Sequence, residues 1–177
     1  MTTEPTLTGH GFSVQLPAAW EGRVYRRSTP VAAFSPQNRA SIAAGEPSPA
    51  GRGWLGEHIN AVLHLANFPL PADRGDYGSG AVEAMTARNT FVALVEFGQE
   101  CLGTALYSSI GLPRVEPRRF DPNGLQRRIP GQSGCQFFFT EASRPMCLYV
   151  VLGSHRVVDL LSAQVNRVLD RIKVDAP

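Results

Sequence analysis

The side chains that could do chemistry are scattered along the chain. Four histidines are spread from one end to the other: His10, His58, His64 and His155. The stretch Gly153-Ser154-His155 lacks the second glycine of an esterase turn. A hydrolase needs a nucleophile, a base and an orienting acid that meet in space. The sequence therefore predicts no catalytic residue, and an enzyme whose site assembles from distant residues stays the alternative.

His58 and His64 are the two histidines closest in sequence, so they are the pair to test as metal ligands. On a strand they would share a face but lie about 20 Å apart, and on a helix they would be almost two turns apart. Either distance is too long for one ion. The stretch Gly51–Gly56 has the spelling of a dinucleotide fingerprint, but a proline-rich loop precedes it where that site needs a buried strand. We therefore expect neither a metal nor a cofactor.

The cysteines and the N-terminal residues bear on the compartment. Cys101, Cys135 and Cys147 form no CxxC pair and are odd in number. The first residues have neither a basic head nor an apolar core. Both observations favour a reduced, cytoplasmic protein without a signal peptide. No apolar run approaches the roughly 20 residues that span a bilayer, so no transmembrane segment is expected.

A basic segment from Arg114 to Arg128 is the best candidate for a binding surface. It holds five arginines against two acidic residues, Glu116 and Asp121. The predicted contact residues are four of these arginines with an aromatic anchor between them: Arg118, Arg119, Phe120, Arg127 and Arg128. Guanidinium groups and an aromatic side chain suit an acidic protein surface or phosphates. The alternative is a solvated edge whose arginines pair with Glu116 and Asp121.

A second candidate contact is Trp54, in a long loop from residue 35 to residue 56 that is rich in proline and glycine. The formal net charge is only +2, and a single phenylalanine interleaves the arginines of the basic segment. Nucleic-acid binders are usually more basic and carry more aromatic side chains at the contact. We therefore expect a protein partner and no nucleic acid.

The elements that must position these residues are clearest near the C-terminus. Residues 135–140 and 146–152 are rich in β-branched and aromatic side chains, and the polar segment 141–145 separates them. This pattern predicts a β-hairpin with a five-residue connection in which Thr140 pairs with Met146. In that register Phe137 and Phe139 share a face with Cys147, Tyr149 and Val151. Because both faces are apolar, the sheet must be covered on both sides.

An amphipathic helix follows the hairpin. Its apolar residues keep the spacing of one helical face: Val157, Val158, Leu161, Val165, Val168, Leu169 and Ile172. Ser154 and Asp159 are candidates for stabilising its start. The sequence thus predicts a long C-terminal helix packed on one face of the sheet.

The rest of the chain supplies further strands. We predict them at the stretches that are apolar or alternate in polarity: residues 12–16, 23–27, 31–34, 60–68 and 90–97, with an edge strand at 118–120. The stretch 60–68 also matches helical spacing, and its short length and flanking prolines favour a strand over its second half. Residues 81–87 predict a short helix that starts after Ser79. Residues 1–9 are expected to be frayed. The whole is a single α+β domain over residues 10–177, with a central, mostly antiparallel sheet flanked by helices.

The opening Gly11-Phe-Ser-Val-Gln-Leu-Pro-Ala-Ala-Trp20 is a strand that ends in Leu-Pro with a tryptophan just beyond, and the chain closes with Ile172-Lys-Val174. These two stretches resemble the ends of Mog1/PsbP-like domains, including the LpqN-like actinobacterial group. The resemblance implies an antiparallel sheet flanked by helices and a role in protein binding without catalysis. The usage of Pro, Gly, Ala and Arg resembles that of proteins from GC-rich bacteria.

Together these observations predict a non-catalytic bacterial accessory or adaptor module that binds a protein partner. The alternative is a small-molecule-binding protein or an enzyme, with a pocket between the sheet and the loop at residues 35–56. The two predicted helices are too few to cover both faces of the sheet, so either the loop at residues 35–56 covers the second face or a second copy of the chain does. A homodimer through that face is therefore a third expectation.

Overall fold

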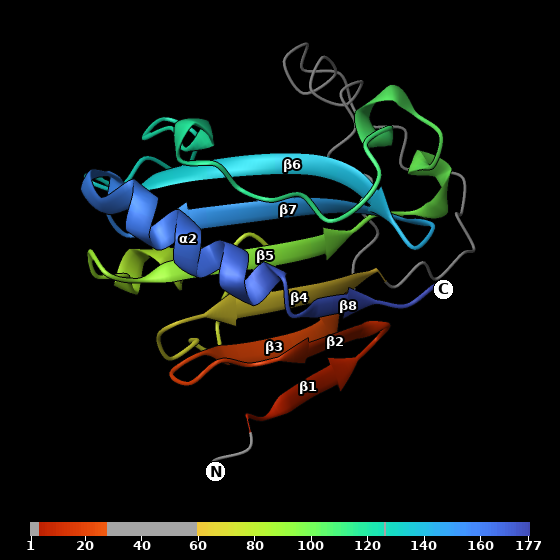
Figure 1. Ribbon diagram of the computed structural model, residues 1–177, viewed down its shortest axis with the longest axis horizontal. Coiled ribbons are helices and arrows are strands. Elements are labelled where there is room, and N and C mark those ends of the chain that lie inside the picture. The colour runs from red at the N-terminus through yellow and green to blue at the C-terminus, as the bar shows by residue number, and fades with distance from the viewer. Residues whose placement is uncertain (1–3, 28–59, 126) are drawn as a thin grey trace, which may run out of the picture.

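The computed structural model describes residues 4–27, 60–125 and 127–177. In these residues the fold is a mostly-β α+β arrangement of two antiparallel sheets and one α-helix (Figure 1). The strands are β1 (Thr6–Gly9), β2 (Phe12–Gln15), β3 (Glu21–Arg26), β4 (Ala61–Ala66), β5 (Thr90–Glu96), β6 (Ser133–Glu141), β7 (Arg144–Leu152) and β8 (Ile172–Val174). The helix is α2 (Val158–Leu169), and short 3₁₀ turns are η1 (Val82–Ala84), η2 (Gln99–Cys101), η3 (Ala105–Tyr107), η4 (Pro117–Arg119) and η5 (His155–Val157).

The larger sheet has five strands in the order β3-β4-β5-β7-β6, and all neighbours are antiparallel. Every residue of β4 and β7 is buried, and so is every residue of β5 except Glu96. A strand can be buried at consecutive positions only when both faces of its sheet are covered. The predicted strands at residues 60–68 and 90–97 are confirmed, and β5 is the central strand.

The hairpin of β6 and β7 is confirmed, but its predicted register was wrong. Thr140 pairs with Pro145, and the connection is the two-residue turn Ala142-Ser143. Both turn residues have positive φ, 49° and 61°, which is the conformation of the tight hairpin turns that match strand twist. A shift of one residue moves each side chain of one strand to the other face. Phe137 therefore pairs with Leu148, and Cys147 lies on the opposite face from Phe137.

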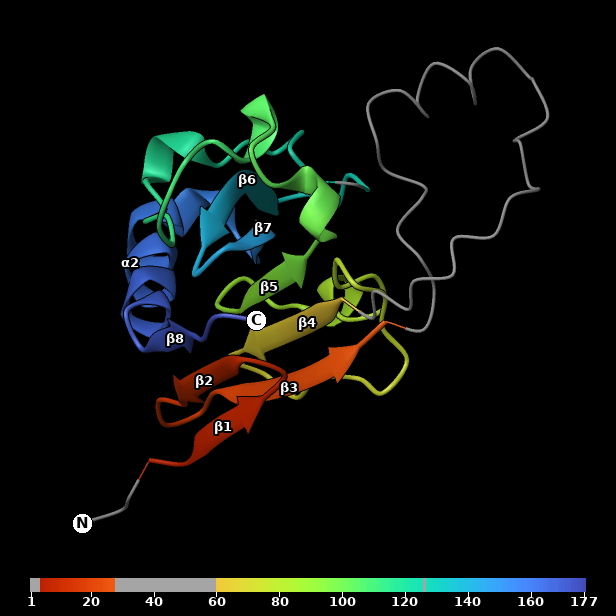
Figure 2. The same cartoon turned by 90° about the vertical axis from the view of Figure 1, so that its right-hand side faces the viewer.

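The first face of the sheet packs against α2. Leu161, Val165 and Val168 of the helix are buried in one core together with Leu148 and Val150 of β7. The predicted helix is confirmed over α2, although Ser154 makes no capping hydrogen bond and the helix ends at Leu169. Figure 2 shows α2 on one side of the sheet and the connecting segments, coloured yellow to green, on the other.

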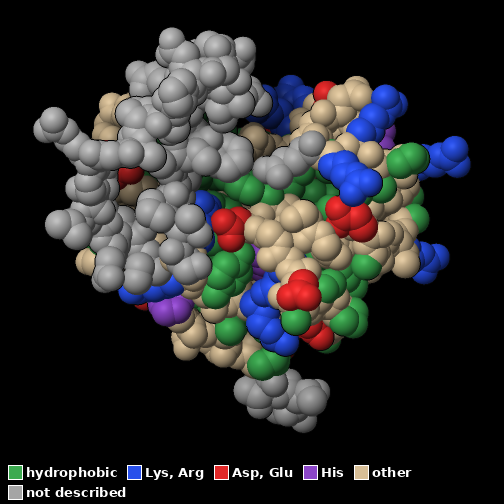
Figure 3. All heavy atoms as spheres, turned by 180° about the vertical axis from the view of Figure 1, so that it is seen from behind, with side chains coloured by type: hydrophobic (Ala, Val, Ile, Leu, Met, Phe, Trp, Pro, Cys, Tyr) green, Lys and Arg blue, Asp and Glu red, His purple; other side chains and the backbone are tan. Residues whose placement is uncertain are grey.

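The second face of the sheet is covered by irregular segments of the same chain. Residues from 68 to 85 and from 97 to 129 pack on it: Phe68, Leu70, Tyr77, Ala81, Val82, Met85, Phe97, Cys101, Tyr107, Leu125 and Ile129. On this side of the molecule, hydrophobic, basic and acidic side chains are interspersed over the part that is not grey (Figure 3). Phe91, Val95 and Val151 on this face have no exposed surface, so the chain itself covers the face at these positions. The homodimer stays a prediction.

The smaller sheet corrects two predictions about the ends of the chain. It has the order β1-β2-β8, so residues 6–9, predicted to be frayed, form a strand paired with β2. Residues 172–174, predicted to continue the helix, form β8 and pair with β2 as well. Both strands are short and contain no fully buried position, so neither has the apolar pattern from which the other strands were predicted.

Two other predicted elements were wrong. The helix at residues 81–87 is reduced to the 3₁₀ turn η1, and the edge strand at 118–120 is replaced by the 3₁₀ turn η4. Pro117 at the start of η4 has the φ of a helical first turn, which explains the preference for a turn there. The predicted strand at residues 31–34 and the loop at 35–56 lie outside the described residues.

The turn between β6 and β7 allows a first prediction. Ser143→Gly is expected to raise the free energy of unfolding by about 0.5–1 kcal/mol, because a residue with a Cβ is strained at positive φ and glycine is not. Urea denaturation followed by circular dichroism measures the change. Ser13→Gly in β2, where φ is negative, is the matched control and should lower stability by a similar amount. A loss of stability in Ser143→Gly would contradict the left-handed turn.

Candidate functional site

The basic segment lies beside β6, the outer strand of the larger sheet. Asp121 bridges to Gly134 of β6 through two backbone hydrogen bonds of 3.0 Å. Val115 is held by Asn166 of α2, whose side chain bonds both its N–H and its C=O at 2.9 Å. These contacts fix η4 between the edge of the sheet and the helix.

The predicted arginines differ in their surroundings. The side chain of Arg118 is 81% exposed and pairs with Glu116 at 2.6 Å. Arg127 is 80% exposed and lies 4.0 Å from Glu83, and Arg128 is exposed as well. The guanidinium of Arg119 lies 5.2 Å from the centre of the Phe137 ring, a cation–π contact. The structure thus brings Arg118 and Arg119 together on η4 and places Arg119 over β6.

The two aromatic residues predicted as contacts are Phe120 and Trp54. Phe120 is 4% exposed and belongs to the core under α2, so it was wrong as an exposed anchor. Packing the apolar ring in that core stabilises the fold, since burying a phenylalanine side chain contributes about 2–3 kcal/mol. Trp54 lies outside the described residues.

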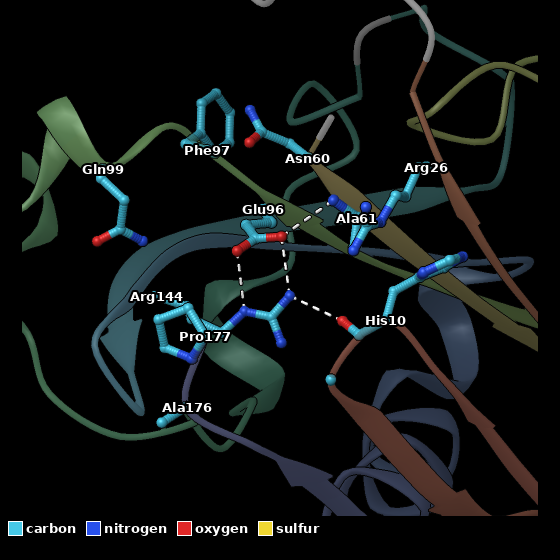
Figure 4. Close-up of a pocket in the computed structure, with 11 residues that line it drawn as sticks. His10, Arg26, Asn60, Ala61, Glu96, Phe97, Gln99, Arg144, Ala176 and Pro177 are labelled. Atoms are coloured by element: carbon cyan, nitrogen blue, oxygen red, sulfur yellow. Dashed lines mark hydrogen bonds and ion pairs between the residues drawn. The ribbon is translucent and has the colours of Figure 1, made fainter. Parts of the chain in front are cut away.

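A second site is a cavity of about 360 Å³ at the end of the larger sheet (Figure 4). It opens where β5 ends, where β7 begins and beside the turn between β1 and β2. Its polar lining comes from six residues: His10, Arg26, Asn60, Glu96, Gln99 and Arg144. Neither Glu96 nor Arg144 was among the residues predicted from the sequence.

An ion pair between Arg144 and Glu96 forms the floor of this cavity. Two guanidinium nitrogens of Arg144 donate to the two carboxylate oxygens of Glu96, each at 2.8 Å, and the side chains are only 5% and 12% exposed. Arg144 also donates to the carbonyl of His10 at 2.8 Å and to that of Asp175 at 3.4 Å, and it stacks on Phe12. Glycine suits position 11 beside it, because φ there is 81° and a Cβ would displace the guanidinium.

The ionisation of Glu96 follows from these contacts. Burial opposes its charge, but the hydrogen bonds from Arg144 and from the N–H of Ala61, with the charge of Arg144, outweigh burial and lower the pKa of the carboxyl. A carboxylate held ionised by two donors is a poor proton acceptor. The pair joins the end of β5 to the turn between β1 and β2 and to the segment after β8.

A buried polar cluster lies on the second face of the sheet. His64 of β4 has 0% exposed surface. Its Nδ1 accepts a hydrogen bond from Nε of Arg74, and its Nε2 lies 2.8 Å from the backbone oxygen of Asp76. These bonds require a proton on Nε2 and none on Nδ1. The Asp76 carboxylate accepts a bond from Tyr25 at 2.8 Å and lies 2.9 Å from Nε of Arg27, at an angle outside that of a hydrogen bond.

Burial is the main cause that lowers the pKa of His64, to about 4, and the charges of Arg74 and Arg27 act in the same direction. The two strand cysteines show the corresponding effect. Burial raises the pKa of Cys135 to about 12 and that of Cys147 to about 11, so both thiols stay protonated at neutral pH. These groups are packed inside the fold.

The described part of the chain offers little else for chemistry. No three His, Cys, Asp or Glu side chains within residues 4–27, 60–125 and 127–177 gather closely enough to hold a metal ion. In the same ranges, no helix has the length and apolar character to cross a bilayer. His58 of the histidine pair considered above lies outside these ranges.

No family model, curated protein or solved structure matches the chain.

The sequence contains a signal for the ion pair at the ends of two apolar runs. Glu96 ends the apolar run of β5 and Arg144 begins that of β7, so two opposite charges border adjacent buried strands. A charged residue at the end of a buried strand needs a partner nearby. Glu96 and Arg144 can pair only because β5 and β7 are neighbours in the sheet, and the spacing of residues in the sequence does not show which strands are neighbours.

The ion pair leads to a second prediction. Arg144→Met is expected to lower the free energy of unfolding by about 3–5 kcal/mol, because it leaves the buried Glu96 carboxylate without its cation. Urea denaturation measures the loss. Arg118→Met, which breaks an exposed pair, is the control and should cost less than about 1 kcal/mol. Equal losses in the two variants would contradict the role of the buried pair.

The histidine leads to a third prediction. Because the folded pKa of about 4 lies below the unfolded value of 6.5, the unfolded chain takes up a proton first as the pH falls. Stability is expected to fall by about 3 kcal/mol between pH 6.5 and pH 4 through this group. His64→Gln should flatten that part of the pH profile, whereas the exposed His155→Gln should leave it. An unchanged slope in His64→Gln would show that His64 does not cause it.

Proposed function

We propose that the protein is a non-catalytic accessory or adaptor module that binds an acidic segment of a protein partner through the basic segment. The observation that carries this proposal is the presentation of Arg118 and Arg119 on η4, with exposed guanidinium groups held on a fixed backbone. Arginine forms bidentate bonds with carboxylates, and a fixed backbone reduces the entropy lost on binding.

The acidic neighbours of these arginines do not block such a role. The pairs of Arg118 with Glu116 and of Arg127 with Glu83 are exposed to solvent. Exposed pairs contribute about 0–1 kcal/mol, so a partner carboxylate can replace them at little cost. The alternative of a solvated edge predicts the same pairs but no partner, and only binding measurements separate the two.

The absence of catalysis in this proposal is supported by where the reactive groups lie. His64, Cys135 and Cys147 are buried, and the hydrogen bonds of His64 are all made within the fold. The Glu96 carboxylate is held by Arg144. A catalytic group needs to reach a substrate and to change its protonation near the working pH.

Two wider expectations stay part of the proposal. An antiparallel sheet with a C-terminal helix packed on it agrees in general terms with the resemblance to Mog1/PsbP-like domains, and similarity of fold alone is weak support for a role. A cytoplasmic location in a bacterium belongs to the same proposal and rests on the cysteine usage and the composition.

The alternative function is small-molecule binding, and the cavity above the Glu96–Arg144 pair is the observation that favours it. Arg26, Asn60 and Gln99 line it with side chains able to donate hydrogen bonds. A thermal-shift screen of small carboxylates and phosphates tests this function, because a ligand at 100 times its dissociation constant adds about 2.7 kcal/mol of stability.

The proposed function leads to a fourth prediction. Exchanging Arg118 and Arg119 together for Glu should reduce recovery of partner proteins from bacterial lysate at least ten-fold, because two attractive charges become repulsive. Pull-down with quantitative mass spectrometry measures the recovery. The control exchanges Arg88 and Arg156, both exposed and remote from η4 in sequence, for Glu, with the same change in net charge. Recovery that is unchanged by the first pair, or lost equally with the control, would refute the basic segment as the contact.

A further inference from the structure

The outer edge of β6 has backbone groups that no described residue uses. In an antiparallel ladder, alternate residues of an edge strand point their N–H and C=O away from the sheet. Gly134 and Thr140 point outward, since their backbone groups bond Asp121, Ser109 and Gly111. Gln136 and Phe138 have the same parity, so they point outward as well. Within the described residues, no hydrogen bond joins their backbone groups to another segment beside β6.

The protein's own chain closes this edge at both ends and leaves its middle open. At one end Asp121 pairs with Gly134, and at the other Ile110 pairs with Thr140. The six steps from Gly134 to Thr140 span about 20 Å of strand. Figure 1 shows β6 as the outermost strand of the sheet, with the teal turn η4 near the end where β6 begins. Proteins commonly protect exposed strand edges, and here that protection is incomplete over Gln136–Phe138.

The surroundings of the open stretch indicate what it would accept. Arg119 lies over Phe137, the residue between the two outward-pointing positions. The side chain of Ile110 is 81% exposed at the far end of the edge. An added strand would therefore lie next to a cation and close to an exposed apolar side chain.

We propose that an extended acidic segment of a partner protein adds as a short strand to β6. Its backbone pairs with the N–H and C=O groups of Gln136 and Phe138, and an acidic side chain meets Arg119. Backbone pairing supplies affinity in this mode of recognition, and the side chains supply specificity. The inference rests on the proposed function and adds to it the conformation and the site of the partner segment.

A second copy of this chain is a less suitable occupant. Antiparallel pairing of two β6 edges about Phe137 would bring the Arg119 side chains of the two copies near each other, and like charges across an interface oppose association. The segments at Ile110 and Asp121 would also meet their counterparts in the other copy. A separate acidic segment meets neither obstacle.

The test is a fifth prediction and uses Gln136→Pro. Proline removes the N–H of residue 136, which points away from the sheet, and its ring covers the edge, while edge strands tolerate proline. Gln136→Ala is the matched control: it loses the same side-chain bond to Cys147 but keeps the N–H. The probe is an eight-residue peptide of alternating glutamate and valine with blocked ends, and its lysine–valine counterpart tests the charge.

Peptide titration is followed by amide NMR and hydrogen exchange on the full chain. The glutamate peptide should slow exchange of the Gln136 and Phe138 amides in the unaltered protein. The glutamate peptide should bind Gln136→Pro at least ten-fold more weakly than the unaltered protein and should bind Gln136→Ala within two-fold of it. The lysine peptide should bind the unaltered protein at least ten-fold more weakly than the glutamate peptide does. Thermal unfolding shows whether Gln136→Pro is folded, and the exchange measurement on the unaltered protein stands without that variant.

The outcomes separate the inference from the proposed function. Binding of the glutamate peptide that is lost with the Arg118 and Arg119 exchange but kept in Gln136→Pro overturns strand addition and keeps the basic segment as the contact. If neither the Arg118 and Arg119 exchange nor Gln136→Pro weakens binding of the glutamate peptide, both strand addition and the basic segment as the contact are overturned. If the glutamate peptide does not bind the unaltered protein, strand addition is overturned. Equal binding of the lysine peptide, or protection of the two amides by self-association in sedimentation experiments, also overturns the inference.

Discussion

The ion pair of Glu96 and Arg144 fixes how the two sheets sit relative to each other. The guanidinium joins the end of β5 to the turn between β1 and β2 and to the segment after β8, segments that no single β-ladder connects. Taking two charges out of water is unfavourable, and five donor–acceptor contacts with Phe12 beneath offset that cost. Moving the small sheet away would leave the guanidinium without the carbonyls of His10 and Asp175, so the pair stabilises the observed arrangement together with the apolar contacts of Phe12 and Val14.

The parts of the fold that the sequence predicted are those with strong local patterns. Each of these patterns lies within one short stretch of chain: the apolar run of β5, the two β-prone runs of the β6–β7 hairpin and the helical spacing of α2. The register of the hairpin could not be predicted from these patterns. Ala142-Ser143 lacks the Asn-Gly or Asp-Gly signature of a two-residue turn, and Pro145 suggested a longer loop. Proline is accepted in β7 because its carbonyl, rather than an N–H, bonds the N–H of Phe97.

The sites were harder to predict than the fold. The basic segment was visible as a cluster of arginines, and its exposure agrees with that interpretation, but the burial of Phe120 depends on α2, which follows it by about 40 residues. The partners of Arg144 come from segments far away in the sequence, whereas Arg74 and Asp76, the partners of His64, follow it by 10 and 12 residues in an irregular segment. Spacing carries no information about such pairs, since the order of strands in the sheet decides which charges meet.

The two faces of the larger sheet each carry one buried cysteine, Cys135 on the face against which α2 packs and Cys147 on the face that the irregular segments cover. A thiol reagent reaches either sulfur only when the layer above it opens, so the rate of labelling at each reports the local opening of that layer. A helix and a set of irregular loops are expected to open at different rates. This chain thus carries its own pair of reporters for comparing the dynamics of a helical cover with those of a loop cover on one sheet.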